Sequence, residues 1–165
     1  MVRDITEKVK SETIVRENEE KLRKTFEGIP DPAYVLERNE DGSIYILHAN
    51  KTIHKLTSGA INKSIGRTVE DVFSTAPEIA EMAHEVLESG DISRRIVKFG
   101  GNSGHREILV ECTLTKTSDN LILLVTEDIS EKKRARDALE RSERDKSIIL
   151  DNIGEHVNFY KDTGM

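Results

Sequence analysis

The sequence predicts an α+β fold, in which a five-stranded antiparallel sheet carries short helices on one face and a helix flanks it at each end. Three observations support this prediction. Two strand-like segments come first, several short helical segments follow, and three further strand-like segments complete the series. Strands joined by short turns pair antiparallel, and helices grouped between two sets of strands cover one face of a sheet. The length of 165 residues fits one such domain with flanking segments.

The first part of the chain predicts a helix and then a hairpin. Apolar side chains spaced among charges indicate a leading helix over residues 9–27. Two prolines end this helix, because each disfavours a helical conformation in the residue before it. Residues 33–36 predict a short strand. The Asp41-Gly42 pair is a strong hairpin signal, so residues 43–48 are expected to form the returning strand.

Asn50 is expected to open a series of short helices, since an asparagine side chain accepts a hydrogen bond from an otherwise unpaired backbone N–H group. Short helical segments are expected over residues 51–57, 60–64 and 68–73, with glycines between them. A longer helix is expected over residues 76–89, because its apolar side chains fall on one face.

Three strands are then expected in succession. The first covers residues 91–99 and leads to a glycine-rich turn at residues 100–104. The second, residues 105–115, alternates between polar and apolar side chains. The third, residues 121–125, is apolar on both faces and is therefore predicted to be a central strand. A long charged helix is expected from Glu131 onward.

Composition argues against several functional classes. The net charge is −6, aromatic residues make up 4% and tryptophan is absent, so stacking platforms for nucleic-acid bases are scarce and nucleic-acid binding is not expected. A single cysteine, Cys112, excludes an internal disulfide and a multi-cysteine metal site. No apolar run approaches the roughly 20 residues that cross a bilayer, and no signal-peptide pattern follows Met1. A cytoplasmic location is expected.

The two ends of the chain resemble each other. Residues 4–8 read Asp-Ile-Thr-Glu-Lys and residues 128–132 read Asp-Ile-Ser-Glu-Lys. The same offset, carried forward without gaps, places Ile29 on Ile153. This register predicts an internal repeat. The alternative is that both ends are generic charged helices.

The repeat predicts a domain organisation. Residues 1–8 are the tail of a preceding unit and residues 9–27 are the leading helix. Residues 28–130 form the central domain, and residues 131–149 form a linker or output helix. Residues 150–165 are the truncated start of a following unit.

The element order and the local sequences resemble the PAS family of sensory domains, over residues 20–130. The matching segments are Phe26–Asp31, Asp41–Ile44, His48–Lys51, Ile65–Phe73 and Asp128–Ser130. The resemblance implies a sensory or relay module of a signal-transduction protein, such as a histidine kinase, with neighbouring PAS and output domains in the parent chain. A ligand-free structural or dimerisation spacer is the alternative.

In the PAS family a conformational bias passes through the last strand into a paired helix, so the resemblance also implies a homodimer through the flanking helices. An aspartate followed three residues later by a glutamate has the spacing of a helix-capping box, which is present at Asp128 and again at Asp4. The implied relay residues are Asp128, Ile129, Ser130 and Glu131.

A pocket for a small-molecule ligand is expected between the sheet and the helix at residues 76–89. Its predicted lining is Met82, Val86, Ile108, Val110 and Cys112. The alternative is that these side chains simply fill the core.

The sequence identifies no cofactor. His84 occupies the helix where some PAS relatives carry a haem ligand, but it lies about 140° around the helix from Ile79, which places it at the rim. The light-sensing subfamily attaches flavin through a cysteine in an Asn-Cys-Arg-Phe-Leu-Gln segment, which this chain lacks. No histidine pair has metal-ligand spacing, so no metal is expected. No nucleophile or acid–base pair assembles, and an enzyme is not expected.

Overall fold

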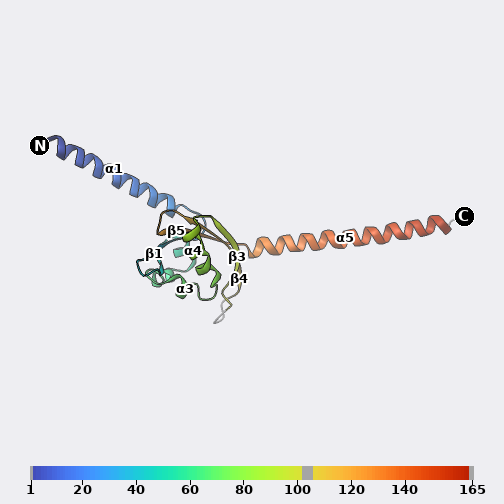
Figure 1. Ribbon diagram of the computed structural model, residues 1–165. Helices are drawn as coiled ribbons and strands as arrows, with labels where there is room; N and C mark the ends of the chain where they lie inside the picture. Colours follow the sequence, from blue (N-terminus) through green and yellow to red (C-terminus); the bar gives the residue numbers. More distant parts are fainter. Residues whose placement is uncertain (1, 102–105, 164–165) are drawn as a thin grey trace. The chain divides into compact units, whose positions relative to one another are not determined.

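The computed structural model describes residues 2–101 and 106–163 (Figure 1). The elements follow the predicted order, and the α+β class with a five-stranded antiparallel sheet is confirmed. Their bounds are α1 (Val2–Glu27), β1 (Ala33–Arg38), β2 (Ile44–Ala49), α2 (Lys51–Leu56), η1 (Ala60–Lys63), α3 (Val69–Val72), α4 (Glu78–Ser89), β3 (Ser93–Phe99), β4 (Ile108–Lys116), β5 (Leu121–Asp128) and α5 (Ser130–Thr163). The chain divides into two compact units, one ending at Asp128 and one beginning at Ile129.

The sheet has the strand order β2-β1-β5-β4-β3, and its neighbouring strands pair antiparallel. β5 therefore lies in the centre, as its apolar sequence predicts. Leu124 is opposite Tyr34 on one side and opposite Leu114 on the other. β5 is also longer than predicted, because Thr126 continues the ladder opposite Cys112 on β4.

The core lies between the inner face of the sheet and the helices α2 to α4, with α4 packed against the sheet (Figure 1). Large side chains with less than 2% exposure come from the strands and from α3 and α4: Leu36, Ile44, Ile46, Val69, Ile79, Met82, Val86, Leu114, Ile122 and Leu124. Burying one such side chain stabilises the fold by about 1.5–3 kcal/mol.

The two edge strands are protected in different ways. β3 carries the exposed charges Arg94, Arg95 and Lys98, which discourage pairing with another sheet. On β2, the backbone N–H of Ile46 donates to the Arg67 carbonyl at 2.9 Å, so the loop before α3 covers that edge.

The predicted boundary between residues 8 and 9 is not a structural break, because α1 is continuous from Val2 to Glu27. Asp4 lies inside the first turn of this helix, so the prediction that it caps a helix is wrong. Asp128, by contrast, is paired with Val110 in the sheet. The repeated Asp-Ile motif thus adopts two different conformations.

α5 likewise crosses the predicted boundary between residues 149 and 150 without a break. α1 ends at Glu27, before the prolines at positions 30 and 32. Gly154 and His156 occupy the corresponding positions of the repeat, so no proline ends α5 there. Part of the predicted turn at residues 100–104, from residue 102 on, lies outside the described residues; its first two glycines have positive φ, as expected.

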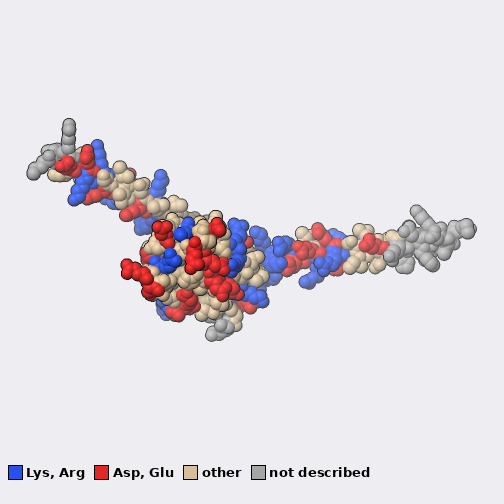
Figure 2. Space-filling view, viewed as in Figure 1, with Lys and Arg blue, Asp and Glu red and all other residues tan. Residues whose placement is uncertain are grey.

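Charges of both signs alternate along α5, as Figure 2 shows. Lys133 lies 3.4 Å from Asp137, and Arg136 lies 3.8 Å from Glu140. Pairs with this spacing each stabilise a solvent-exposed helix by a few tenths of a kcal/mol. They support the helical state of α5.

Candidate ligand cavity

A cavity of about 310 Å³ lies between the inner face of the sheet and the helices. Its walls come from β1, β3, β4 and β5, from α2, from the ends of α3 and α4, and from the loop after α1. The lining residues are Pro32, Tyr34, Ile53, Leu56, Phe73, Ile79, Phe99, Ile108, Val110, Thr126 and Asp128. The cavity is therefore mainly apolar, with polar groups from β1 and from the end of β5.

Only some of the five residues predicted to line a pocket line this cavity. Ile108 and Val110 line the cavity. Met82, Val86 and Cys112 are fully buried in the surrounding core and are not among the lining residues. Sequence periodicity identified the inward faces of α4 and β4, but it does not indicate which part of the interior is left unfilled.

Three aromatic rings form one wall of the cavity. The Tyr34 and Phe73 rings meet edge to face, with centroids 5.6 Å apart and planes at 83°. The centroids of the Phe73 and Phe99 rings are 6.2 Å apart. Edge-to-face pairs contribute beyond the apolar area that they bury, so this wall is well defined.

Tyr34 and Thr126 are polar lining side chains that sequence reasoning missed. The inward direction of Tyr34 was predictable, because it alternates with Ala33 and Val35 and shares the face of Leu36. Tyr34 is 6% exposed, and no described residue forms a hydrogen bond with its hydroxyl. Within the described residues, no fully buried polar side-chain atom lacks a partner, so the hydroxyl has accessible surface. The Tyr34 residue also lines the cavity.

The hydroxyl of Tyr34 keeps its proton. Burial raises the pKa of Tyr34 well above its ordinary value of 10.0, and the neighbouring Cys112 thiol adds a smaller effect in the same direction. The cavity thus offers a neutral O–H group that can donate a hydrogen bond.

The end of β5 joins the cavity to both flanking helices. The backbone N–H and the hydroxyl of Thr126 lie 2.9 and 3.3 Å from the carbonyl oxygen of Pro32, and both donate to it. Pro32 belongs to the loop that follows α1, and both residues line the cavity. Asp128 also lines the cavity and is the last residue of β5.

The four predicted relay residues form the junction between β5 and α5. Asp128 ends the strand, and Ser130 begins the helix, whose first turn contains Glu131. The carbonyl of Ile129 accepts a hydrogen bond from the N–H of Lys133 at 2.8 Å. The main-chain hydrogen bonds of α5 thus begin at the Ile129 carbonyl, one residue after Asp128.

Asn50 fixes the wall formed by the loop after α1. Its Oδ1 accepts from the N–H groups of Ile53, at 3.3 Å, and Ala33, at 3.0 Å, which confirms the predicted cap of α2. Its Nδ2 donates to the carbonyls of Ile29, at 3.1 Å, and Asp31, at 2.9 Å. Asn50 is fully buried, and this one side chain holds the loop, β1 and α2 together.

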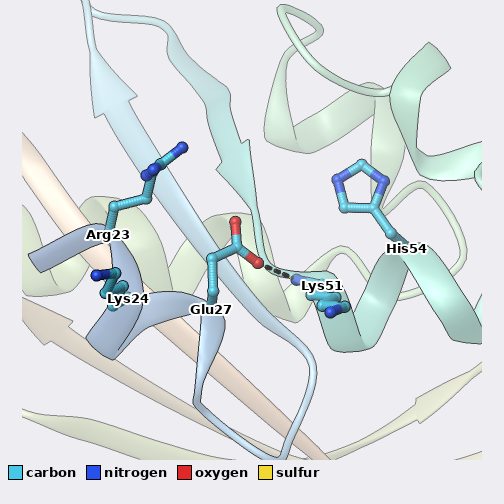
Figure 3. Close-up of a pocket in the computed structure, with 5 residues that line it drawn as sticks. All are labelled: Arg23, Lys24, Glu27, Lys51 and His54. Carbon is cyan, nitrogen blue, oxygen red and sulfur yellow. Dashed lines mark hydrogen bonds between the residues drawn. The ribbon is translucent and has the colours of Figure 1, made fainter. Parts of the chain in front are cut away.

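A second, open depression of about 460 Å³ lies between the last turns of α1 and the start of α2, and Arg23, Lys24, Glu27, Lys51 and His54 line it (Figure 3). The Glu27 carboxylate accepts a hydrogen bond from the Lys51 N–H at 2.6 Å. This contact attaches α1 to α2. Glu27 and the basic side chains of α1 are exposed to solvent.

His84 lies at the rim of the domain, as predicted. Its side chain is 44% exposed, and its Nε2 lies 3.1 Å from the Glu70 carboxylate. The residues that line the cavity include no histidine.

Two further findings concern the described part of the chain. No group of three or more histidine, cysteine, aspartate or glutamate side chains in it has the geometry to hold a metal ion. None of its helices has both the length and the apolar character needed to cross a membrane.

No family model and no curated protein matches this sequence, whereas solved structures match its fold. An RNA-binding light-oxygen-voltage receptor matches with a TM-score of 0.57 and 16% identity, over 76% of this chain and 36% of that one. The PAS domain of an HTR-like protein from Haloarcula marismortui matches with a TM-score of 0.53 and 17% identity, over 73% of this chain and 98% of that one. The chain has the PAS fold.

A third match agrees with this assignment. A domain of a sensory box sensor histidine kinase/response regulator from Geobacter sulfurreducens has a TM-score of 0.53 and 15% identity, over 69% of this chain and 96% of that one. In this PAS fold the cavity opens between the sheet and the helices, and the last strand leads directly into α5.

Proposed function

We propose that this PAS domain is a sensory module of a cytoplasmic signal-transduction protein, a histidine kinase or a similar regulator, and that it is not itself an enzyme. A small molecule in the cavity changes the end of β5, and the change passes through Asp128–Glu131 into α5. The observation that carries this proposal is that Thr126 and Asp128, both near the end of β5, line the cavity, and that α5 begins at Ser130.

The cavity wall gives such a ligand a physical means of action. A ligand shifts a conformational equilibrium only when it binds the two states with different affinity. A molecule in this cavity contacts both Pro32 and Thr126, whose hydrogen bonds join the α1 loop to β5. A state in which the loop after α1 moves relative to the end of β5 changes the ligand's contacts with Pro32 and Thr126. Ligand binding and the position of the end of β5 are therefore coupled.

The apolar side chains of α5 support an output through a homodimer. Leu139, Ile149 and Ile153 are 60%, 57% and 53% exposed. Large apolar side chains that share a helix face and lack cover in one copy are typical of a pairing surface. Neighbouring PAS and output domains of the parent chain would receive the change.

A ligand-free structural or dimerisation spacer is the second candidate. The observation in its favour is that Met82, Val86 and Cys112, which were expected to surround a pocket, pack in a filled core. The two candidates differ in whether a change in the cavity alters α5.

Filling the cavity from within separates them. Val110→Phe places an aromatic ring in the cavity, and Ile96→Phe, at an exposed position of β3, is the matched control. A nitroxide at Arg144→Cys, an exposed position of α5 on the side away from Leu139, Ile149 and Ile153, reports by electron paramagnetic resonance on label mobility and on the distance between copies. The buried Cys112 does not react with the label, because the thiolate is the reactive form. If the domain is a sensory module, Val110→Phe changes the label signal and Ile96→Phe does not. An unchanged signal in a folded Val110→Phe variant refutes the relay.

A further inference from the structure

We propose that the ligand of this cavity is a neutral, predominantly apolar molecule of about one or two rings whose acceptor atom takes a hydrogen bond from the Tyr34 hydroxyl. This assignment rests on the proposed function, because it names the chemistry of the ligand that the sensory site would bind.

The first step is the hydroxyl itself. Buried tyrosine hydroxyls normally find a hydrogen-bond partner. Tyr34 is only 6% exposed, yet no described residue forms a hydrogen bond with its hydroxyl. The hydroxyl keeps some accessible surface and Tyr34 lines the cavity, so we infer that a molecule in the cavity supplies the missing partner.

The second step is the ligand's charge. Burial holds the pKa of Tyr34 above its ordinary range, so the hydroxyl donates a proton to the hydrogen bond over the physiological pH range. The lining residues include no lysine, arginine or histidine, and their one charged side chain, Asp128, would repel an anion. An anionic ligand would therefore lose its hydration without gaining a counter-charge, which is strongly unfavourable. A carbonyl, ether or aromatic ring nitrogen provides an acceptor without this cost.

The third step is the ligand's size and shape. A cavity of about 150 Å³ lined by apolar side chains holds benzene. The cavity here, at about 310 Å³, has room for a substituted single ring or a two-ring molecule. Tyr34, Phe73 and Phe99 present ring edges and faces on one side, and Ile79, Ile108 and Val110 offer aliphatic surface elsewhere.

Three small probes of similar shape test these properties on the whole chain. Acetophenone carries a neutral acceptor, cumene replaces the carbonyl by hydrocarbon, and benzoate carries a negative charge. Their affinities are measured by isothermal titration for the wild type, for Tyr34→Phe and for the matched control Tyr45→Phe. Tyr45 lies on the neighbouring strand, outside the cavity lining, and its hydroxyl contacts Asp41 at 3.2 Å.

The expected result is a selective loss. Tyr34→Phe weakens acetophenone binding by roughly 2- to 10-fold, the usual contribution of one hydrogen bond. It leaves cumene binding unchanged, and Tyr45→Phe changes neither affinity. Benzoate binds to none of the proteins. Without a probe, Tyr34→Phe unfolds at the wild-type temperature, because the substitution removes no hydrogen bond within the protein.

Four results would overturn the assignment: equal losses for acetophenone and cumene, benzoate binding as tight as acetophenone binding, no binding of any probe, or a marked fall in the unfolding temperature of Tyr34→Phe alone. Failure of the relay is a separate outcome. In that case acetophenone binding still depends on Tyr34, while the spin label on α5 does not respond to Val110→Phe.

Discussion

At the scale of single residues, the arrangement around the cavity depends most on Asn50. Its side chain satisfies two backbone donors and two backbone carbonyls that come from three different segments. A buried group that loses its hydrogen-bond partner costs about 1–3 kcal/mol. The Ile29 carbonyl also accepts from the Thr52 hydroxyl at 3.0 Å. No other described side chain is seen to bond the Asp31 carbonyl or the Ala33 N–H, however, so we expect removal of Asn50 to act on the whole domain.

The substitution Asn50→Ala is therefore expected to lower the free energy of unfolding by about 3 kcal/mol or more, as measured by urea denaturation. Thr68→Ala is the matched control, because Thr68 caps α3 through a single 3.3 Å contact with the N–H of Asp71. The control should cost only about 1 kcal/mol. Equal costs for the two substitutions would show that Asn50 acts as a simple helix cap.

Cys112 makes the free energy of unfolding depend on pH in the alkaline range. Burial, and secondarily the Glu111 carboxylate, raise the pKa of the Cys112 thiol from 9.0 to about 12. Between these two values the unfolded thiol loses its proton while the folded one keeps it. The folded state then binds more protons, so the free energy of unfolding falls as pH rises.

We expect this fall to amount to about 1 kcal/mol between pH 9 and pH 10, measured by urea denaturation. Tyr34 adds a smaller decline between pH 9 and pH 10 and most of its effect above pH 10, since its ordinary pKa is 10.0 and burial raises it. Cys112→Ala should be less stable at every pH but should lose less stability over this interval. A parallel decline in the variant would assign the effect to other groups.

At the scale of secondary-structure elements, the exposed apolar face of α5 predicts pairing. Ile149→Asp places a charge on this face and should weaken the homodimer about tenfold or more, as measured by sedimentation equilibrium, because a buried unpaired carboxylate is costly. Ser147→Asp adds the same charge about 160° away around the helix and should leave association unchanged. Monomeric wild-type protein, or equal weakening by both substitutions, would contradict pairing through this face.

The sequence predicted the elements well where the local signal and the tertiary structure agree. The hairpin at Asp41-Gly42, the cap at Asn50 and the apolar face of α4 each depend on a few neighbouring residues. The extension of β5 to Asp128 was missed, because the pairing of its polar end with β4 is a non-local interaction.

The candidate site was predicted less completely, for a related reason. Inward direction follows from alternation along a strand, and it placed Ile108 and Val110 correctly beside the cavity. The unfilled volume depends on how side chains from distant segments pack, so Phe73, Phe99 and Tyr34 could not be brought together from their positions in the sequence. A tyrosine on an otherwise apolar face was the one signal that could have pointed to the polar group.

At the scale of the whole molecule, the chain forms two compact units that are joined through the single segment from Asp128 to Ser130. A signal that travels along the chain must pass through this segment, and its transmission requires a stiff connection. Two glycines inserted between Asp128 and Ile129 should therefore uncouple the units without disturbing the cavity, since the ladder of β5 ends at Asp128.

The insertion is tested in the protein that carries the label at Arg144→Cys. We expect Val110→Phe to change the label signal in the uninserted protein and to leave it unchanged after the insertion, while acetophenone binds both with the same affinity. Two glycines inserted between Glu40 and Asp41, in the exposed turn between β1 and β2, serve as the control and should preserve both properties. If α5 still responds after the junction has been made flexible, the change reaches the helix by a route other than the last strand, and the role assigned to Asp128–Glu131 is wrong.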